Sequence, residues 1–204
     1  MTEQRTDEWF AERAGKVTAS RINDVMMAKT TAGYQNYRAQ LVCERLTGEA
    51  VEGFTSAAMQ HGTDTEPQAR AFYELEVGQP VAEVGFVRHA TIQMAGASPD
   101  GLVGELGLVE IKCPQPAEHI RLLSGGSIKK QYDLQMHWQM ICTGREWCDF
   151  VSFCPTFPAE MQMHIQRVKY DAEKEQEITA AVVQFLAEVD ALTADLQRKY
   201  REAA

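Results

Sequence analysis

The sequence predicts an α+β fold in which a central mixed β-sheet is flanked by helices and followed by a long C-terminal helix. Three observations predict it. Helical patterns dominate the first 77 residues, and the stretch 81–114 then breaks into short segments rich in β-branched residues. Helices, two further strands and a last helix follow. With 204 residues, 45% of them hydrophobic and 24% charged, we expect one soluble globular domain over residues 1–204.

Start and stop signals mark helices in the N-terminal part. Residues 6–14 are predicted to form a short helix with Thr6 as its N-cap. A second start signal is Thr18-Ala19-Ser20, ahead of RINDVMMA. Residues 35–47 carry apolar or small residues at helical spacing, and Gly48 is a natural C-terminal stop.

The stretch 56–77 is a long helical candidate with a weakened middle. Gly62 costs conformational entropy in a helix, and Pro67 removes a backbone hydrogen bond. Two helices, or one helix that begins late, are therefore both open interpretations.

The later elements follow from the same rules. Consecutive antiparallel strands are predicted at 81–89, 91–98, 101–105 and 107–114. Helices are predicted at 115–126 and 128–144, and strands at 146–154 and 160–168. The last helix, 171–203, has one apolar stripe that we expect to pack on the core or on another subunit: Ile178, Val182, Phe185, Val189, Leu192 and Leu196.

Charge and composition restrict the class of protein. The net charge of −9 argues against a protein that coats nucleic acid by bulk electrostatics, but it leaves room for a nucleic-acid enzyme with local basic contacts. The charged N-terminus lacks the apolar core of a signal peptide, and no apolar run approaches the roughly 20 residues that span a bilayer. We expect a cytosolic protein with no membrane partner.

The five cysteines are expected to be free thiols, since their number is odd and no CxxC pair occurs. Three of them, Cys142, Cys148 and Cys154, are spaced by six residues, which invites a metal-site interpretation. Without CxxC or HxxxH partners, small buried hydrophobic side chains are the better interpretation.

The stretch SPDGLVGELGLVEIKCP (98–114) holds the candidate chemistry. On a strand, Glu110 and Lys112 point to one face, and the apolar residues Val109, Ile111 and Cys113 point to the other. The glycines of the preceding hairpin allow Asp100 to fold back beside Glu110. The alternative is the charged edge of an ordinary hairpin.

An Asp and a Glu that converge beside a Lys make a plausible site for Mg²⁺ or Mn²⁺. The carbonyl of Ile111 can supply a further ligand, and Lys112 can orient or deprotonate a water or stabilise charge on phosphorus. This chemistry is phosphodiester hydrolysis.

Two other places can contribute to this site. Glu66 can offer a third carboxylate, or it can be a solvated acid on a helix face. Gln135 and Gln139 share a helix face at spacing i, i+4, with His137 between them pointing elsewhere. Their amides can bind a backbone phosphate or a metal-bound water, or they can be ordinary surface groups.

Five motifs in order resemble the phage lambda exonuclease family, the YqaJ-like recombinases within the PD-(D/E)xK nuclease superfamily. They are ERAGKVTAS (12–20), HGTDTEPQAR (61–70), SPDGLVG (98–104), LVEIKCP (108–114) and YDLQMHWQM (132–140). The family's restriction-endonuclease-like core agrees with the α+β prediction. The last motif departs from the family's Q-x-Q, because its second position is His137, so which of Gln135, His137 and Gln139 reaches the site stays open.

The resemblance implies roles for individual residues. Asp100, Glu110 and the Ile111 carbonyl bind catalytic Mg²⁺, for which Mn²⁺ can substitute, Lys112 serves the attacking water, and Glu66 is an additional acid. Arg13 and Ser20 hold a DNA 5′-phosphate, where a guanidinium fork is apt, and Ser98 lies beside the metal site.

The resemblance also implies an activity and partners. The family is a 5′→3′ exonuclease on linear double-stranded DNA, forms a homotrimeric ring, and hands a 3′ single strand to a phage single-strand annealing protein in the bacterial cytoplasm. An endonuclease of the restriction or junction-resolving type is the alternative, and an inactive DNA-binding scaffold subunit is disfavoured because Asp100, Glu110 and Lys112 are all present.

Overall fold

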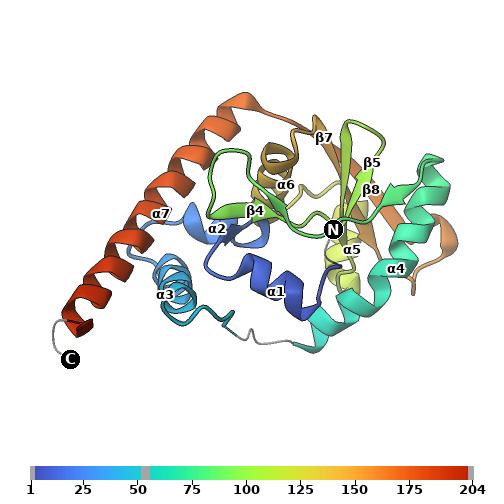
Figure 1. Ribbon diagram of the computed structural model, residues 1–204. Helices are drawn as coiled ribbons and strands as arrows, with labels where there is room; N and C mark the ends of the chain where they lie inside the picture. The colour runs from blue at the N-terminus through green and yellow to red at the C-terminus, as the bar shows by residue number, and fades with distance from the viewer. Residues whose placement is uncertain (1–2, 52–55, 202–204) are drawn as a thin grey trace.

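The computed structural model describes residues 3–51 and 56–201 (Figure 1). The N-terminal part begins as predicted, because the Thr6 side chain accepts a hydrogen bond from the Trp9 N–H and caps the first helix. Gly48, with φ 78°, ends the third helix in the left-handed conformation that glycine adopts without strain. The elements are α1 (Asp7–Arg13), β1 (Val17–Thr18), the 3₁₀ helix η1 (Ala19–Arg21), α2 (Ile22–Val25) and α3 (Ala32–Thr47).

The stretch 56–77 forms one continuous helix, α4 (Ala57–Val77), and neither breaks at its middle nor begins late. Ser56 caps it by accepting a hydrogen bond from the Met59 N–H. Pro67 is exposed and Thr63, whose carbonyl loses its usual N–H partner, is partly exposed, so the missing hydrogen bond is not in the core. The proline is therefore tolerated in the helix interior.

A five-stranded mixed sheet forms the centre of the molecule, as predicted. Its order is β2-β5-β6-β7-β8; β6 and β7 are parallel, and the other neighbours are antiparallel. The strands are β2 (Val81–Ala82), β5 (Gly101–Val103), β6 (Gly107–Lys112), β7 (Trp147–Phe153) and β8 (Met163–Lys169).

The prediction that the central strands follow one another antiparallel in one sheet is wrong in part. β3 (Val87–Arg88) and β4 (Ala95–Ala97) leave the central sheet and join β1 in a small second sheet of order β1-β4-β3. β4 pairs in parallel with β1, at the register Val17↔Ala95. This pairing joins segments far apart in sequence, so local periodicity cannot reveal it.

Helices cover both faces of the central sheet. On one face, Ala69 and Tyr73 of α4 pack against Val109 and Ile111 of β6. On the other face the apolar residues come from two more helices, α5 (Pro116–Leu123) and α6 (Lys130–Thr143). Strand β6 is consequently buried from both sides, and any charge that it carries must find a partner.

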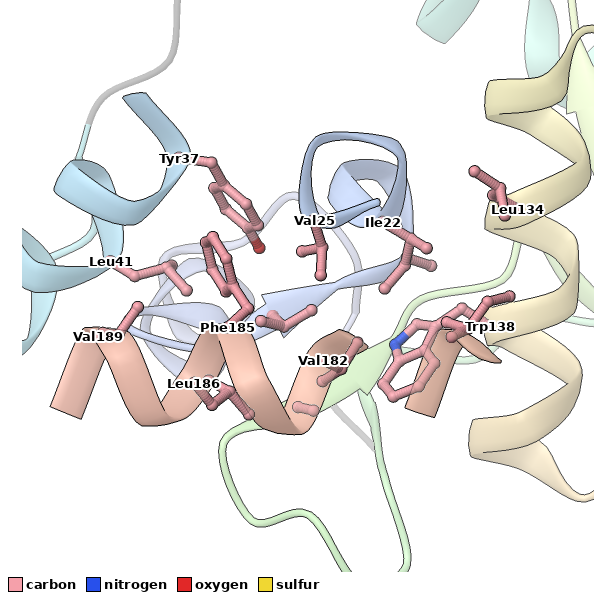
Figure 2. Packing of buried hydrophobic residues seen from close by; sticks show 14 of the residues in the cluster. Ile22, Val25, Tyr37, Leu41, Leu134, Trp138, Val182, Phe185, Leu186 and Val189 are labelled. Carbon is pink, nitrogen blue, oxygen red and sulfur yellow. The ribbon is translucent and has the colours of Figure 1, made fainter. Parts of the chain in front are cut away.

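The long last helix, α7 (Ala172–Arg201), packs against the N-terminal helices (Figures 1 and 2). Phe185 stacks on Tyr37 of α3, with ring centroids 5.4 Å apart. Of the predicted apolar stripe, Ile178, Val182, Phe185 and Val189 are fully buried and the last two leucines are partly buried. The stripe therefore packs on this chain's own core. Residues 202–203 of the predicted helix lie outside the described residues.

The remaining described segment with helical character is a short 3₁₀ turn, η2 (Ala159–Met161), between β7 and β8. Across the residues that the structure describes, no helix has both the length and the apolar character to cross a membrane.

Candidate active site

The hairpin of β5 and β6 brings Asp100 beside Glu110. The register pairs Gly101 with Val109, and continuing it by one residue places Asp100 opposite Glu110. An Oδ2 atom of Asp100 accepts a hydrogen bond from the Ile111 N–H at 2.7 Å. A Cβ atom on Gly101 would lie 2.0 Å from Cγ1 of Val81, so the neighbouring strand leaves room only for glycine. The two acids thus converge as the sequence predicts.

Glu110 is fully buried and held by three donors. The Gln135 amide donates to Oε1 at 2.7 Å, and the Gln139 amide donates to Oε2 at 2.6 Å. Nζ of Lys112 forms an ion pair with Oε1. Both glutamines therefore position the acid. Gln139, which is completely buried, is not an ordinary surface group.

His137 points away from this cluster. It is buried, its Nε2 lies 2.9 Å from Nζ of Lys174 on α7, and it also faces Asp133 at 3.5 Å. Of the three residues in the late helix, the structure brings the two glutamines to Glu110 and assigns the histidine to the contact between α6 and α7.

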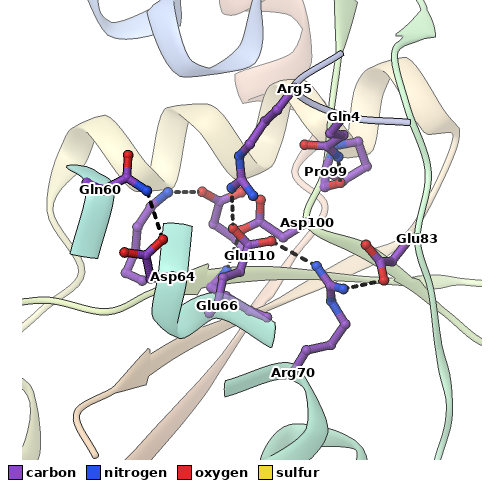
Figure 3. A network of polar contacts seen from close by, with 12 residues as sticks. Gln4, Arg5, Gln60, Asp64, Glu66, Arg70, Glu83, Pro99, Asp100 and Glu110 are labelled. Carbon is purple, nitrogen blue, oxygen red and sulfur yellow. Dashed lines mark hydrogen bonds and ion pairs between the residues drawn. The ribbon is translucent and has the colours of Figure 1, made fainter. Parts of the chain in front are cut away.

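Glu66 approaches the same acids from α4 (Figure 3). Its Oε1 accepts a hydrogen bond from Arg70 at 2.8 Å and its Oε2 accepts one from Arg5 at 2.6 Å. Only 13% of the Glu66 side chain is exposed, so it is not a solvated acid on a helix face. Burial and Glu110 are the main causes that raise the pKa of Asp100, and the negative charge of Glu66 adds to them.

Asp100 is the carboxylate of this cluster that lacks a cation of its own. In the described part of the chain no Lys, Arg or His lies within ion-pair distance of it. Burial and the neighbouring Glu110 raise the pKa of Asp100 well above its usual value, although Lys112 opposes them. Burial would lower the pKa of Lys112, but Glu110 and Asp100 together raise it above its usual value.

These residues fit a hard divalent cation by their donor set. Asp100 offers an unpaired carboxylate, and a positive charge beside it would remove the repulsion that raises its pKa. One buried acceptor, Oε1 of Gln139, has no hydrogen-bond partner. However, no group of three or more His, Cys, Asp or Glu side chains in residues 3–51 and 56–201 is already arranged to hold a metal ion. Binding would require the donors around Glu110 to rearrange.

A second group of polar residues lies at the edge of the small sheet. The Arg13 guanidinium stacks on the Trp9 ring at 3.8 Å and reaches Oγ of Ser98 at 3.5 Å. The Trp9 indole N–H donates to the same Oγ at 3.0 Å. Burial lowers the pKa of Arg13 to about 10, with partial compensation from Tyr37 and Glu44, so the side chain stays charged at neutral pH.

Ser20 reaches the same edge by strand pairing. Because β1 and β4 are parallel, Ser20 beyond β1 and Ser98 beyond β4 leave the small sheet at the same end. The Ser20 side chain is exposed, and its hydroxyl makes no hydrogen bond to any described residue. Its hydroxyl is therefore not committed to a partner among these residues.

The evenly spaced cysteines are not gathered with other possible ligands into a group of three or more in the described part of the chain. Cys142, Cys148 and Cys154 are free and buried, as predicted for small hydrophobic side chains. Burial raises the pKa of Cys142 and of Cys148, so both remain thiols. Cys113 at the end of the acidic motif has its pKa raised to about 12, through burial first and then through Glu66 and Asp100.

Sequence reasoning missed three residues around these groups. Arg5 pairs with Glu66, Trp9 supports Arg13, and Tyr132 lies under Nζ of Lys112 at 5.2 Å from its ring centroid. The four-residue spacing of Trp9 and Arg13 on one helix could have indicated their contact. Arg5 and Tyr132 have no comparable signal, since they depend on contacts between distant segments.

The part of the chain that holds the predicted site residues matches a known protein family. The YqaJ-like viral recombinase domain matches residues 8–146. The chain belongs to this family. The resemblance inferred from the five motifs is therefore confirmed.

Solved structures confirm the fold as well. The crystal structure of an alkaline exonuclease (LHK-Exo) from Laribacter hongkongensis has a TM-score of 0.92 and 50% sequence identity, over 98% of this chain and 100% of that chain. A structure of LHK-Exo in complex with dAMP matches equally well. A phage related exonuclease from Haemophilus somnus 129PT, with a TM-score of 0.69, 14% identity and coverage of 89% and 96%, shares the fold. No curated protein sequence matches the chain.

Proposed function

We propose that this chain is a Mg²⁺-dependent 5′→3′ exonuclease that digests one strand of linear double-stranded DNA from a 5′-phosphorylated end. That the chain is a nuclease acting on DNA follows from its family and from the alkaline exonuclease that it resembles over its whole length. The observation that supports metal-dependent hydrolysis is the register of the β5–β6 hairpin. It places Asp100 opposite Glu110, which pairs with Lys112.

The residues of the hairpin take the catalytic roles. Asp100, Glu110 and the Ile111 carbonyl would hold Mg²⁺, or Mn²⁺ in its place, with Glu66 as an additional acid. When bound, the metal activates water and stabilises the leaving oxygen. Gln135 and Gln139 fix the Glu110 carboxylate, and Lys112 presents its N–H donors to the attacking water or to the charge that develops on phosphorus.

The residues at the edge of the small sheet would bind the 5′-phosphate of the DNA end. The fork of Arg13, held flat on Trp9, suits a terminal phosphate, which carries more negative charge than an internal phosphodiester. The free hydroxyl of Ser20 and that of Ser98 can donate to the same group. Ser98 is two residues before Asp100, so the strand end would be held close to the cutting site.

Assembly and partners complete the proposal. Digestion leaves a 3′ single strand for annealing-type recombination by a phage single-strand annealing protein, in the cytoplasm of a bacterial host. A homotrimeric ring would retain the duplex topologically, which is consistent with a net charge of −9, because a closed ring does not need a strongly basic exterior.

One assay tests the activity. Linear duplex with and without a 5′-phosphate, and covalently closed circles, are incubated with protein and Mg²⁺. We expect digestion of 5′-phosphorylated linear DNA with circles spared, and no digestion by Lys112→Ala, while Lys199→Ala on the exposed end of α7 serves as the control. Cut circles would indicate an endonuclease instead. Absence of hydrolysis in both Mg²⁺ and Mn²⁺ would leave only a DNA-binding scaffold role.

A further inference from the structure

The segment before α1 is tied to the loop that carries Asp100. The Gln4 amide donates two hydrogen bonds, to the carbonyl of Val84 at 2.7 Å and to that of Pro99 at 2.9 Å (Figure 3). Arg5 follows with φ 69°, the one positive φ of a non-glycine residue in the described part of the chain. A side chain disfavours this conformation, so the contacts around Arg5 must maintain it.

The side chain of Arg5 ends on the acidic cluster. It donates to Oε2 of Glu66 at 2.6 Å, and Figure 3 shows it directed toward Glu66, next to Asp100 and Glu110. About half of the Arg5 side chain, 47%, is exposed. The guanidinium that contacts this acidic cluster is thus accessible from solvent.

Glu66 keeps a second cationic partner when Arg5 leaves. Arg70, one helical turn further along α4, already pairs with Glu66 at 2.8 Å, and only 14% of its side chain is exposed. Arg70 is also held by Glu83. Arg5 is therefore the partner that can leave Glu66 without stranding a buried carboxylate, whereas Arg70 is fixed in place.

We propose that Arg5 binds a backbone phosphate of the DNA strand at the active site, and that Glu66 holds Arg5 in place when no DNA is bound. The proposal rests on the proposed function and adds a second phosphate contact to it. Arg13 contacts Ser98, at the start of the segment that leads to Asp100, whereas Arg5 contacts Glu66 of α4, so the two guanidinium groups would bind different phosphates of one strand.

The test measures how DNA binding depends on salt, in Ca²⁺ to prevent hydrolysis, with a labelled 5′-phosphorylated duplex and fluorescence anisotropy. Each phosphate contact adds about 0.7–0.9 to the slope of log K against log salt concentration. We expect Arg5→Gly to lower the slope by about that amount and to weaken binding several-fold. Glycine is chosen because it adopts φ 69° without strain. Arg5→Lys should keep most of the slope, since it keeps the charge.

Two further variants separate binding from folding. Arg198→Ala removes an exposed, ion-paired arginine of α7 and should leave the slope unchanged. Glu66→Gln frees Arg5 and should tighten DNA binding. If Arg5 only stabilised the fold, Arg5→Gly would lower the melting temperature without changing the slope, and that result would overturn the proposal. A wild-type protein that does not bind duplex DNA would overturn the proposed function together with it.

Discussion

Two buried carboxylates lie on neighbouring parallel strands, and their surroundings differ. Asp149 of β7 is opposite Val109 of β6, one residue from Glu110. Asp149 accepts two hydrogen bonds from Arg167, at 2.7 and 2.8 Å, and one from the Tyr73 hydroxyl at 2.8 Å. Its charge is balanced by Arg167, which pairs with no second acid in the part of the chain that the structure describes.

The acids around Glu110 are not each matched by a cation of their own. Lys112 pairs with Glu110, and its charge is also the nearest compensation for Asp100, whose pKa stays well above its usual value because of burial and Glu110. Burial alone therefore does not distinguish a functional acid from a structural one. The distinguishing feature is Asp100, a buried carboxylate that has a hydrogen bond from the Ile111 N–H but no Lys, Arg or His within ion-pair distance among the described residues, and this makes the cluster receptive to a cation.

The largest expected effect is the loss of nuclease activity when Asp100 is replaced. Asp100→Asn should reduce nuclease activity about a thousandfold or more, since it removes a carboxylate that is proposed to hold the metal ion. The melting temperature without metal should stay the same or rise, because the repulsion from Glu110 is relieved. Nuclease assays and thermal denaturation in EDTA check both parts; a clear loss of stability would place Asp100 with the structural acids.

Replacing Asp149, whose charge is balanced by Arg167, should lower stability and leave activity unchanged. Asp149→Ala leaves the buried Tyr73 hydroxyl and one side of Arg167 without partners, and we expect a loss of about 2–4 kcal/mol in the free energy of unfolding. Activity of the folded protein at low temperature should remain near that of the wild type. Urea denaturation measures the loss, and Asp149→Asn, which still accepts from Tyr73, should lose less. Inactive but stably folded Asp149→Ala would contradict this assignment.

A smaller effect is expected at the glutamines that hold Glu110. Gln139→Leu removes the donor to Oε2 and should raise the Mg²⁺ concentration needed for half-maximal activity about 10–100-fold, because groups behind a metal ligand orient it. A Mg²⁺ titration of the initial rate checks this. Gln131→Ala, an exposed glutamine on the same helix, is the matched control and should not change the titration.

The smallest effect concerns a paired carboxylate near the surface. His137 first, and then Lys174, lower the pKa of Asp133 to about 2, below the usual 3.8. The stabilisation that this ion pair provides is present above about pH 4 and is lost as the pH falls toward 2, where Asp133 takes up its proton in the folded state. Asp133→Asn should therefore cost about 1 kcal/mol at pH 6 and clearly less at pH 2, where about half of Asp133 is protonated in the folded state. An equal cost at both pH values in urea denaturation would contradict it.

Local rules predicted the parts of the site that are close in sequence. The convergence of Asp100 and Glu110 follows from a short hairpin with glycines at its turn, and the shared face of Gln135 and Gln139 follows from helical spacing. Caps at Thr6 and Gly48 likewise mark helix ends in sequence as in structure.

Features that depend on distant segments could not be predicted. The parallel pairing of β1 with β4 moves two central strands into a second sheet, and no local period encodes it. The pairing of Arg5 with Glu66 depends on where the N-terminal segment crosses the site. Pro67 misled the helix prediction because propensity does not report which side of a helix faces water.

The pairing of β1 with β4 has a consequence for where the strand end lies relative to the cutting site. Ser20 and Arg13 flank one strand of this pair, and the other strand runs directly into Ser98 and Asp100. In the proposed enzyme, the group that grips the strand end and the group that cuts are thus joined by a ladder of backbone hydrogen bonds, not by a flexible linker. In that enzyme, the register of β1 against β4 would fix the distance between the bound strand end and the cutting site.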